Sequence, residues 1–179
     1  MQTSHTDRLA KLTIDSPLGE LRIAVTQIGV VKLGFPGGAR SDFNAWLKQR
    51  IPCFESSSEL QVLDEARAQL EAYFAGRLRQ FSLPLDLRGS PFQVQVWRRL
   101  ADIPYGETIT YGELARALGK PGGMRAVGAA SGANPLPIVL PCHRVVASGG
   151  KLGGFGGGLD AKRTLLVLEQ RLAPVLTAV

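Results

Sequence analysis

The sequence predicts an α+β protein in two parts: a small N-terminal α+β domain with an antiparallel sheet, and a mainly helical C-terminal domain with a helix-turn-helix. Apolar and polar residues alternate within residues 11–35, whereas apolar residues recur at helical spacing between residues 90 and 132. Residues 77–90 combine proline, glycine and alternating leucines, which indicates a connection. A chain of 179 residues accommodates one or two compact domains. We therefore predict domains at residues 1–87 and 88–179.

In the N-terminal part we expect a three-stranded meander followed by two helices. The first strand is expected at residues 11–15, a turn at 16–19, and two further strands at 21–26 and 30–35. Apolar residues at helical spacing predict helices at residues 41–49 and 59–74, separated by a loop at 51–58. Because residues 1–80 gather no catalytic groups, we expect this domain to be structural.

Two capping boxes mark helix starts in the second half. Ser90 is placed as an N-cap, with Pro91 at the first helical position and Gln93 at the third. Thr110 and Glu113 repeat the pattern and predict a helix that ends near residue 118. A proline-glycine turn at residues 121–123 then separates this helix from a third one at residues 124–132. Two helices joined by a short glycine-containing turn are typical of a helix-turn-helix.

The third helix consists almost entirely of small residues after Arg125. Its two glycines each weaken a helix by roughly 1 kcal/mol relative to alanine, so a compensating contact is needed. Small side chains allow close approach either to a neighbouring helix or to a nucleic-acid groove, with Arg125 leading. The residues alone leave both interpretations open.

Charge is unevenly distributed along the chain. Residues 1–87 hold ten basic and ten acidic residues, whereas residues 88–179 hold eleven basic and five acidic ones. The entire excess of six positive charges therefore lies in the second half, which favours a polyanionic partner, nucleic acid first. A merely basic surface is the alternative.

Several classes of protein are excluded by composition. No run of about 18 apolar residues exists, so we expect no membrane span. We also find no signal peptide, and two widely spaced cysteines indicate a reduced, cytoplasmic protein. The two cysteines and two histidines lack zinc-ligand spacing, so we expect neither a metal nor a cofactor.

Residues 134–144 carry the most distinctive local pattern. An apolar run, residues 138–140, lies between prolines 135, 137 and 141 and leads directly to Cys142 and His143. Proline restricts itself and the residue before it, so we expect a stiff, extended arm in the interior. Without further context, Cys142 and His143 could be inert core residues.

The C-terminal residues supply a possible partner for His143. Seven glycines within residues 148–158 precede a helix at 160–172, with Asp160 as its N-cap, and are better explained as a pocket wall than as a linker. Glu169 lies on the apolar face of that helix. A buried carboxylate needs a donor, for which His143 and Arg144 compete.

This arrangement would activate a cysteine. If Glu169 holds one nitrogen of His143 and the other faces Cys142, the imidazole can take the thiol proton. Neighbours in an extended segment point to opposite sides, so a bridging water or a kink at Cys142 is needed. A thiol hydrolase would use the same groups, and a DNA-binding protein without chemistry is the other alternative.

Several motifs together resemble those of the O6-alkylguanine-DNA alkyltransferases, also called methylated-DNA–protein-cysteine methyltransferases. The similarity is dense over residues 88–170 and looser before them, where it rests on the meander and residues 72–76. The active-site motif of that family is matched by Pro141-Cys142-His143-Arg144-Val145. Further matches are Asn134-Pro135, Phe92-Gln93, Val96-Trp97, Ile103-Pro104, Gly106-Glu107-Thr108, Thr110-Tyr111, Arg125-Ala126-Val127-Gly128 and Gly157-Gly158-Leu159.

The resemblance implies a function and the details of the fold. The N-terminal domain would be ribonuclease-H-like and the helix-turn-helix winged-helix-like, in a monomer that can cluster along DNA. The protein would bind double-stranded DNA containing O6-alkylguanine and flip the lesion out of the stack. It would then transfer the alkyl group irreversibly to its own Cys142, and would treat O4-alkylthymine in the same way. Each molecule would act once.

The resemblance also implies roles for individual residues. Cys142 would be the acceptor, activated by His143 and Glu169, while Tyr111 would press on the flipped nucleotide's phosphate and donate to the guanine. Arg125 would replace the flipped base in the stack. The helix in the minor groove would also present Ala126, Ala129, Ala130 and Ser131. The substrate pocket would comprise Asn134, Pro137, Val145, Leu152, Phe155 and Gly156.

Two departures from the family pattern accompany these matches. Phe155 and Gly156 stand where some members have Tyr-Ser, which removes a side-chain contact and bears on the range of alkyl groups. The zinc ligands found in some N-terminal domains are absent. A related non-repairing branch lacks the cysteine, and Cys142 argues against membership in it.

Overall fold

The computed structural model describes residues 6–36, 43–57 and 61–172. The N-terminal part contains a four-stranded sheet in the order β3-β2-β1-β4. Strands β1 (Asp7–Ile14), β2 (Leu21–Thr26) and β3 (Val30–Gly34) are antiparallel, whereas β4 (Phe54–Ser56) pairs in parallel with β1. The predicted meander is therefore confirmed, although β1 begins four residues before the expected position.

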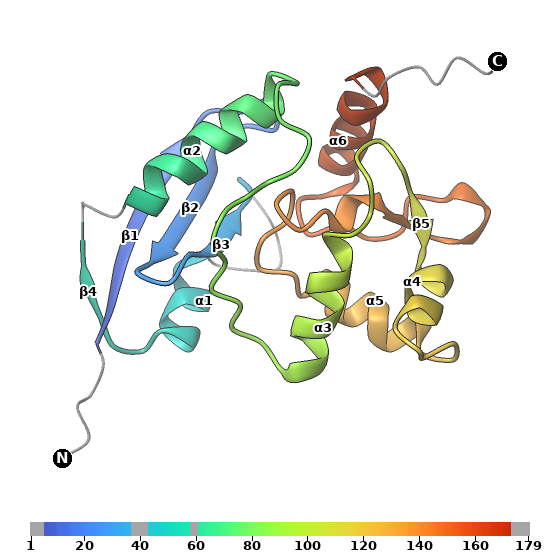
Figure 1. Ribbon diagram of the computed structural model, residues 1–179, viewed down its shortest axis with the longest axis horizontal. Helices are drawn as coiled ribbons and strands as arrows, with labels where there is room; N and C mark the ends of the chain where they lie inside the picture. The colour runs from blue at the N-terminus through green and yellow to red at the C-terminus, as the bar shows by residue number, and fades with distance from the viewer. Residues whose placement is uncertain (1–5, 37–42, 58–60, 173–179) are drawn as a thin grey trace.

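Two helices cover the two faces of this sheet (Figure 1). Helix α2 (Gln61–Phe74) packs through Leu70 and Tyr73 against one face, in the core that includes Ile23 and Val25. Helix α1 (Phe43–Arg50) packs through Phe43 and Leu47 on the other, with Leu9, Ala24 and Val31. Successive residues of a strand point to opposite faces of the sheet, and here both faces carry apolar side chains. The sheet therefore has a core on each side.

The expected loop at residues 51–58 is partly wrong, because it contains β4. This strand pairs with the first residues of β1, with Phe54 opposite Asp7. This parallel pairing joins segments nearly fifty residues apart. A strand of three residues is also too short to show an alternating pattern, so the sequence did not reveal it. Residues 58–60, where the next predicted helix was expected to begin, lie outside the described residues.

The C-terminal part is helical and lies beside the sheet domain (Figure 1). It comprises α3 (Pro91–Leu100), α4 (Tyr111–Ala117), α5 (Met124–Gly132) and α6 (Leu159–Leu172), and a short parallel pair of β5 (Ile109–Thr110) and β6 (Val145–Val146). Both predicted capping boxes form, at Ser90 with Gln93 and at Thr110 with Glu113. The indole of Trp97 donates to the carbonyl of Ala130 at 2.8 Å, which fixes α3 against α5.

Residues 134–144 are buried as predicted, but they are not extended. Leu140 N–H donates to Leu136 O at 2.8 Å, and Ile138 has a φ of 77°. The prolines restrict the residues next to them, so the reversal of direction falls on Ile138. Residues Cys142–Arg144 then form the 3₁₀ turn η1. This turn is a kink at Cys142, one of the two arrangements that would let His143 face the thiol.

A backbone hydrogen bond from β3 links the sheet to the second part, because Leu33 N–H donates to Pro135 O at 2.9 Å. The same strand also holds the connection, since Val30 exchanges hydrogen bonds with Pro84 O and Asp86 N–H. One edge of the sheet therefore supports the segment that carries Cys142. Within the described residues, no helix combines the length and apolarity needed to cross a membrane.

Candidate active site

Glu169 is the centre of a buried hydrogen-bond network. It is fully buried on α6, as its position among leucines predicted. Its Oε1 contacts His143 Nε2 at 2.8 Å, and Arg144 reaches both carboxylate oxygens at 2.9 Å through Nε and Nη2. The two candidate partners for this carboxylate are thus both used.

Two further donors complete the shell of Glu169. The hydroxyl of Tyr73, on α2, donates to Oε1 at 2.7 Å, and the backbone N–H of Gly106 donates to Oε2 at 3.2 Å. Burial raises the pKa of Glu169, but the hydrogen bonds and charges of His143 and Arg144 outweigh it and lower the pKa to about 2. The side chain is therefore a carboxylate at neutral pH.

His143 is held with one nitrogen bound and the other available. It is fully buried, and its Nδ1 has no hydrogen-bond partner in the described part of the chain. Burial lowers the pKa of this imidazole, and the bond to Glu169 only partly opposes that effect. The neutral ring therefore donates Nε2–H to Glu169, which leaves Nδ1 as a proton acceptor.

Cys142 begins the turn η1 and is 8% exposed. Burial raises the pKa of its thiol to about 11, while a hydrogen bond with Asn134 and the charge of Lys162 act in the opposite direction. Asn134 also donates to Leu140 O at 2.7 Å and accepts from Leu136 N–H at 3.0 Å. It therefore braces the turn that presents the thiol.

Lys162 is a buried cation of this site that the sequence did not reveal. Its ammonium donates to Val145 O at 2.6 Å and to Leu152 O. Burial lowers the pKa of Lys162, and the neighbouring Cys142 raises it. These hydrogen bonds join α6 to the two segments on either side of η2 (Ser148–Gly150). The positive charge of Lys162 also favours the thiolate of Cys142.

A small pocket opens in front of Cys142. Its wall includes Tyr111 at the start of α4, and burial together with Cys142 raises the pKa of this phenol. Phe155 and Gly156, in the glycine-rich segment, also line the pocket, as expected for a pocket wall rather than a linker. We call this the acceptor pocket; it is lined by Tyr111, Ser131, Gly132, Asn134, Pro137, Cys142, Gly154, Phe155 and Gly156.

Two of the expected pocket residues, Val145 and Leu152, are not among those that line the acceptor pocket. Val145 is fully buried in β6, and its carbonyl accepts from Lys162, as does the carbonyl of the half-buried Leu152. Their contribution is to anchor the wall, because Lys162 occupies both carbonyls.

Helix α5 presents an exposed face on one side and packs on the other. Arg125, Ala126 and Ala129 are exposed. Ala130 and Ser131 are only 4% exposed, and they do not share that face: the Ala130 carbonyl binds Trp97, and Ser131 lines the acceptor pocket. The packing interpretation is therefore confirmed for the inner side of the helix, while its outer side stays open.

Sequence reasoning missed Tyr73, Gly106 and Lys162. Tyr73 lies in a part of the chain expected to be purely structural, and its position on the apolar face of α2 resembles any core aromatic residue. Lys162 stands two residues after the expected helix start, among exposed neighbours such as Arg163. Within residues 6–36, 43–57 and 61–172, no group of three or more histidine, cysteine or acidic residues is placed to hold a metal ion.

Replacing Glu169 by Gln should destabilise the protein in a pH-dependent manner. A carboxylate whose pKa falls from 4.5 to about 2 on folding contributes about 3 kcal/mol at neutral pH. This stability is present above the unfolded pKa and is lost as the pH falls through about 2. Denaturant unfolding should give Glu169→Gln a lower free energy of unfolding than wild type at neutral pH, and this difference should shrink only in acid. The exposed control Glu107→Gln should unfold like wild type. An equal deficit at every pH would contradict the ionised carboxylate.

Replacing Lys162 by Met should make Cys142 harder to ionise. Removing the nearby positive charge raises the pKa of the thiol, by about one unit or more. The rate of iodoacetamide labelling of Cys142, followed by peptide mapping across a pH series, should shift to higher pH. Lys151→Met removes an exposed lysine from the same region and should leave the profile unchanged. An unshifted profile in Lys162→Met would show that its charge does not act on the thiol.

Comparison with known proteins assigns both parts of the chain. Residues 9–87 match the family model "6-O-methylguanine DNA methyltransferase, ribonuclease-like domain", and residues 91–171 match the "DNA binding domain" of the same family. A methylated-DNA–protein-cysteine methyltransferase of Mycolicibacterium paratuberculosis is 47% identical over 162 residues, which cover 90% of this chain and 93% of that protein. One from Methanosarcina barkeri is 44% identical, over 88% of this chain and 94% of its own.

Solved structures agree with these sequence matches. The Mycobacterium tuberculosis OGT, crystallised in complex with DNA, superposes with a TM-score of 0.77 at 42% identity, covering 94% of this chain and 96% of that one. An O6-methylguanine-DNA methyltransferase from the archaeon Pyrococcus kodakaraensis gives 0.63 at 29% identity, over 90% and 98%. The network around Cys142, the helix-turn-helix and these similarities lead to one conclusion: the chain belongs to the 6-O-methylguanine DNA methyltransferase family.

Proposed function

We propose that this protein repairs DNA directly, by transferring the alkyl group of O6-alkylguanine in double-stranded DNA to Sγ of its own Cys142. The observation that carries this proposal is a cysteine that lines a pocket, next to a histidine whose second nitrogen is fixed by a buried carboxylate. Relatives that cover nearly the whole chain are named for the same transfer.

The proposed reaction is a displacement at the alkyl carbon. The thiolate forms a new S–C bond while the C–O6 bond breaks, and the guanine takes up a proton and returns to its normal form. His143 accepts the thiol proton at Nδ1, and Glu169 stabilises the resulting positive charge. Tyr111, which lines the pocket, would donate to the guanine. Because water does not cleave the S–C bond of the thioether at neutral pH, Cys142 is not regenerated and each molecule acts once.

The exposed face of α5 is the proposed DNA contact. Arg125, with Ala126 and Ala129 beside it, offers one cation on a surface of small side chains, which suits close approach to a minor groove. Arg125 would fill the stack when the lesion is flipped into the acceptor pocket. Flipping costs a few kcal/mol, and less for a base that pairs poorly.

Several finer points belong to the same proposal. The division into a structural domain at residues 1–87 and a DNA-binding, alkyl-accepting domain at 88–179 accords with the two family models. O4-alkylthymine would be a further substrate. The protein would work in the cytoplasm as a monomer that can cluster along DNA.

Replacing Cys142 by Ser should abolish transfer while lesion binding persists, because the thiol supplies the bond but little of the contact surface. Intact-protein mass spectrometry after mixing with excess O6-methylguanine duplex should show one added methyl group on the wild type, located on Cys142 by peptide mapping, and none on the variant. Cys53→Ser removes the other, exposed cysteine and should behave as wild type. Repeated turnover would instead indicate a hydrolase.

Replacing Arg125 by Ala should impair flipping more than general DNA binding. The lost side chain fills the stack, so transfer from duplex should slow by about tenfold or more, with a small change in affinity for undamaged duplex. Single-turnover rates and fluorescence anisotropy measure the two quantities. Arg67→Ala, at an exposed position of α2, should alter neither. Equal losses in rate and affinity would make Arg125 a phosphate contact only.

A further inference from the structure

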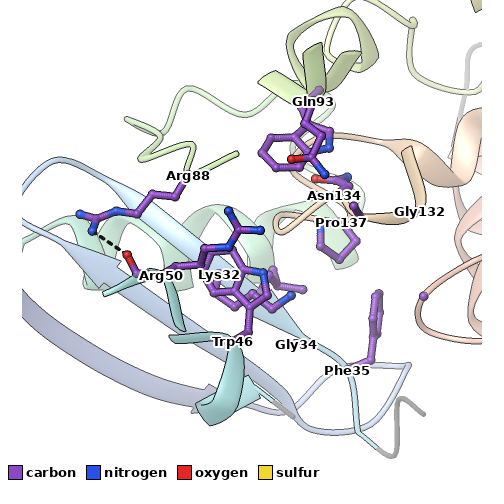
Figure 2. Close-up of a pocket in the computed structure, with 14 residues that line it drawn as sticks. Lys32, Gly34, Phe35, Trp46, Arg50, Arg88, Gln93, Gly132, Asn134 and Pro137 are labelled. Atoms are coloured by element: carbon purple, nitrogen blue, oxygen red, sulfur yellow. Dashed lines mark hydrogen bonds between the residues drawn. The ribbon is translucent and has the colours of Figure 1, made fainter. Parts of the chain in front are cut away.

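A second pocket, larger than the acceptor pocket, lies where the N-terminal and C-terminal parts meet (Figure 2). Its volume is about 270 Å³. Figure 2 shows Lys32, Trp46 and Arg50 together on one side and Gln93, Asn134 and Pro137 on the other. We call it the interdomain pocket. It adjoins the acceptor pocket, because both are lined by Gly132, Asn134, Pro137 and Gly156.

The charged residues of the interdomain pocket are all basic. Lys32, Arg50 and Arg88 line it, and no aspartate or glutamate does. Arg88 is already neutralised, since it binds Asp7 and Asp86 at 2.8 Å each. Lys32 and Arg50 form no salt bridge with any described residue. Two positive charges of the pocket therefore have no carboxylate partner among the described residues.

Lys32 is the unusual member of this pair. It is only 6% exposed, and within the described chain its ammonium contacts no hydrogen-bond acceptor. The nitrogen lies 5.0 Å from the centre of the Trp46 ring, a cation–π contact that offsets part of the cost of burial. Burial lowers the pKa of Lys32 to about 8, so the side chain is still mostly charged at neutral pH. An ammonium that is partly removed from water and has no anion beside it loses solvation energy, and a bound anion would offset that loss.

We propose that the interdomain pocket binds a phosphate group, held by the ammonium of Lys32 and the guanidinium of Arg50. Arg50 is exposed at the mouth and also lies over Trp46, with 6.0 Å between Cζ and the ring centre, so both cations are gathered around one indole. A guanidinium and an ammonium together offer the forked and single donors that phosphate oxygens accept.

The phosphate has two conceivable sources in a protein of this family. One is a strand of DNA that passes the end of α5, because Gly132 at that end lines the interdomain pocket. The other is a free nucleotide. The site goes beyond the proposed function, since it requires neither a lesion nor the thiol of Cys142.

The protein contains its own reporter for this site. Both of its tryptophans, Trp46 and Trp97, line the interdomain pocket, so intrinsic tryptophan fluorescence reports on occupancy. We would titrate the full chain at constant ionic strength with inorganic phosphate, with dGMP and with a lesion-free single-stranded oligonucleotide. A saturable change is expected with at least one of these probes.

Variants assign the response to the two cations. Lys32→Met and Arg50→Gln should each weaken binding by about tenfold, as expected for the loss of a charge-assisted hydrogen bond. Lys32→Arg should retain binding. Lys48→Met removes an exposed lysine of α1 that does not line the pocket, and should bind as wild type. Lys32→Met should melt no lower than wild type, because it removes an unpaired buried charge; if it fails to fold, the exposed Arg50 decides the test.

The outcomes separate the sources and can overturn the proposal. Tighter binding of the oligonucleotide than of dGMP identifies a DNA strand, and the reverse identifies a free nucleotide. Saturation by none of the three probes, or equal affinity in wild type, Lys32→Met and Arg50→Gln, would overturn the site. Cys142→Ser should bind the probes unchanged, so a failure of alkyl transfer and a failure of this site are distinguished.

Discussion

The carboxylate of Glu169 is the interaction on which the rest of the site depends. Five hydrogen bonds from four residues converge on it, from α2, the turn at Gly106 and the segment η1. A buried charge is stable only when its lone pairs are filled, so these segments must be placed together. The orientation of His143, and with it the base next to Cys142, follows from that requirement.

The thiol is positioned by a second constraint, the bracing of residues 134–141. Three prolines remove conformational freedom, and the Asn134 side chain closes the turn from within. The positive φ of Ile138 is then sustained by its full burial rather than by a local preference. Cys142 lies where the braced turn ends and η1 begins. Its position therefore depends on both the bracing by Asn134 and the hydrogen bonds of Glu169.

Local signals predicted much of this fold. The capping boxes at Ser90 and Thr110 placed α3 and α4 because side-chain and backbone groups within four residues decide them. Glu169 was also predictable, since a carboxylate among leucines demands a partner. Strand β4 and the roles of Tyr73 and Lys162 were not, because each depends on a contact with a segment remote in sequence, and a pattern of neighbouring residues carries no information on such contacts. The turn at Ile138 was missed although its hydrogen bonds are local, because prolines suit an extended segment as well as a turn.

The hydroxyl of Tyr73 makes the site in the second half of the chain depend on a residue of the first half. Each half carries its own family model, and a recombination event near residue 88 would transmit each of them intact. The carboxylate in the second half nevertheless takes one of its donors from the first. A graft whose new N-terminal half brought phenylalanine to this place would leave Oε1 with one donor fewer, in a site closed to water. An exchanged N-terminal half would therefore have to supply a donor at this position, even where the surfaces that meet are otherwise compatible.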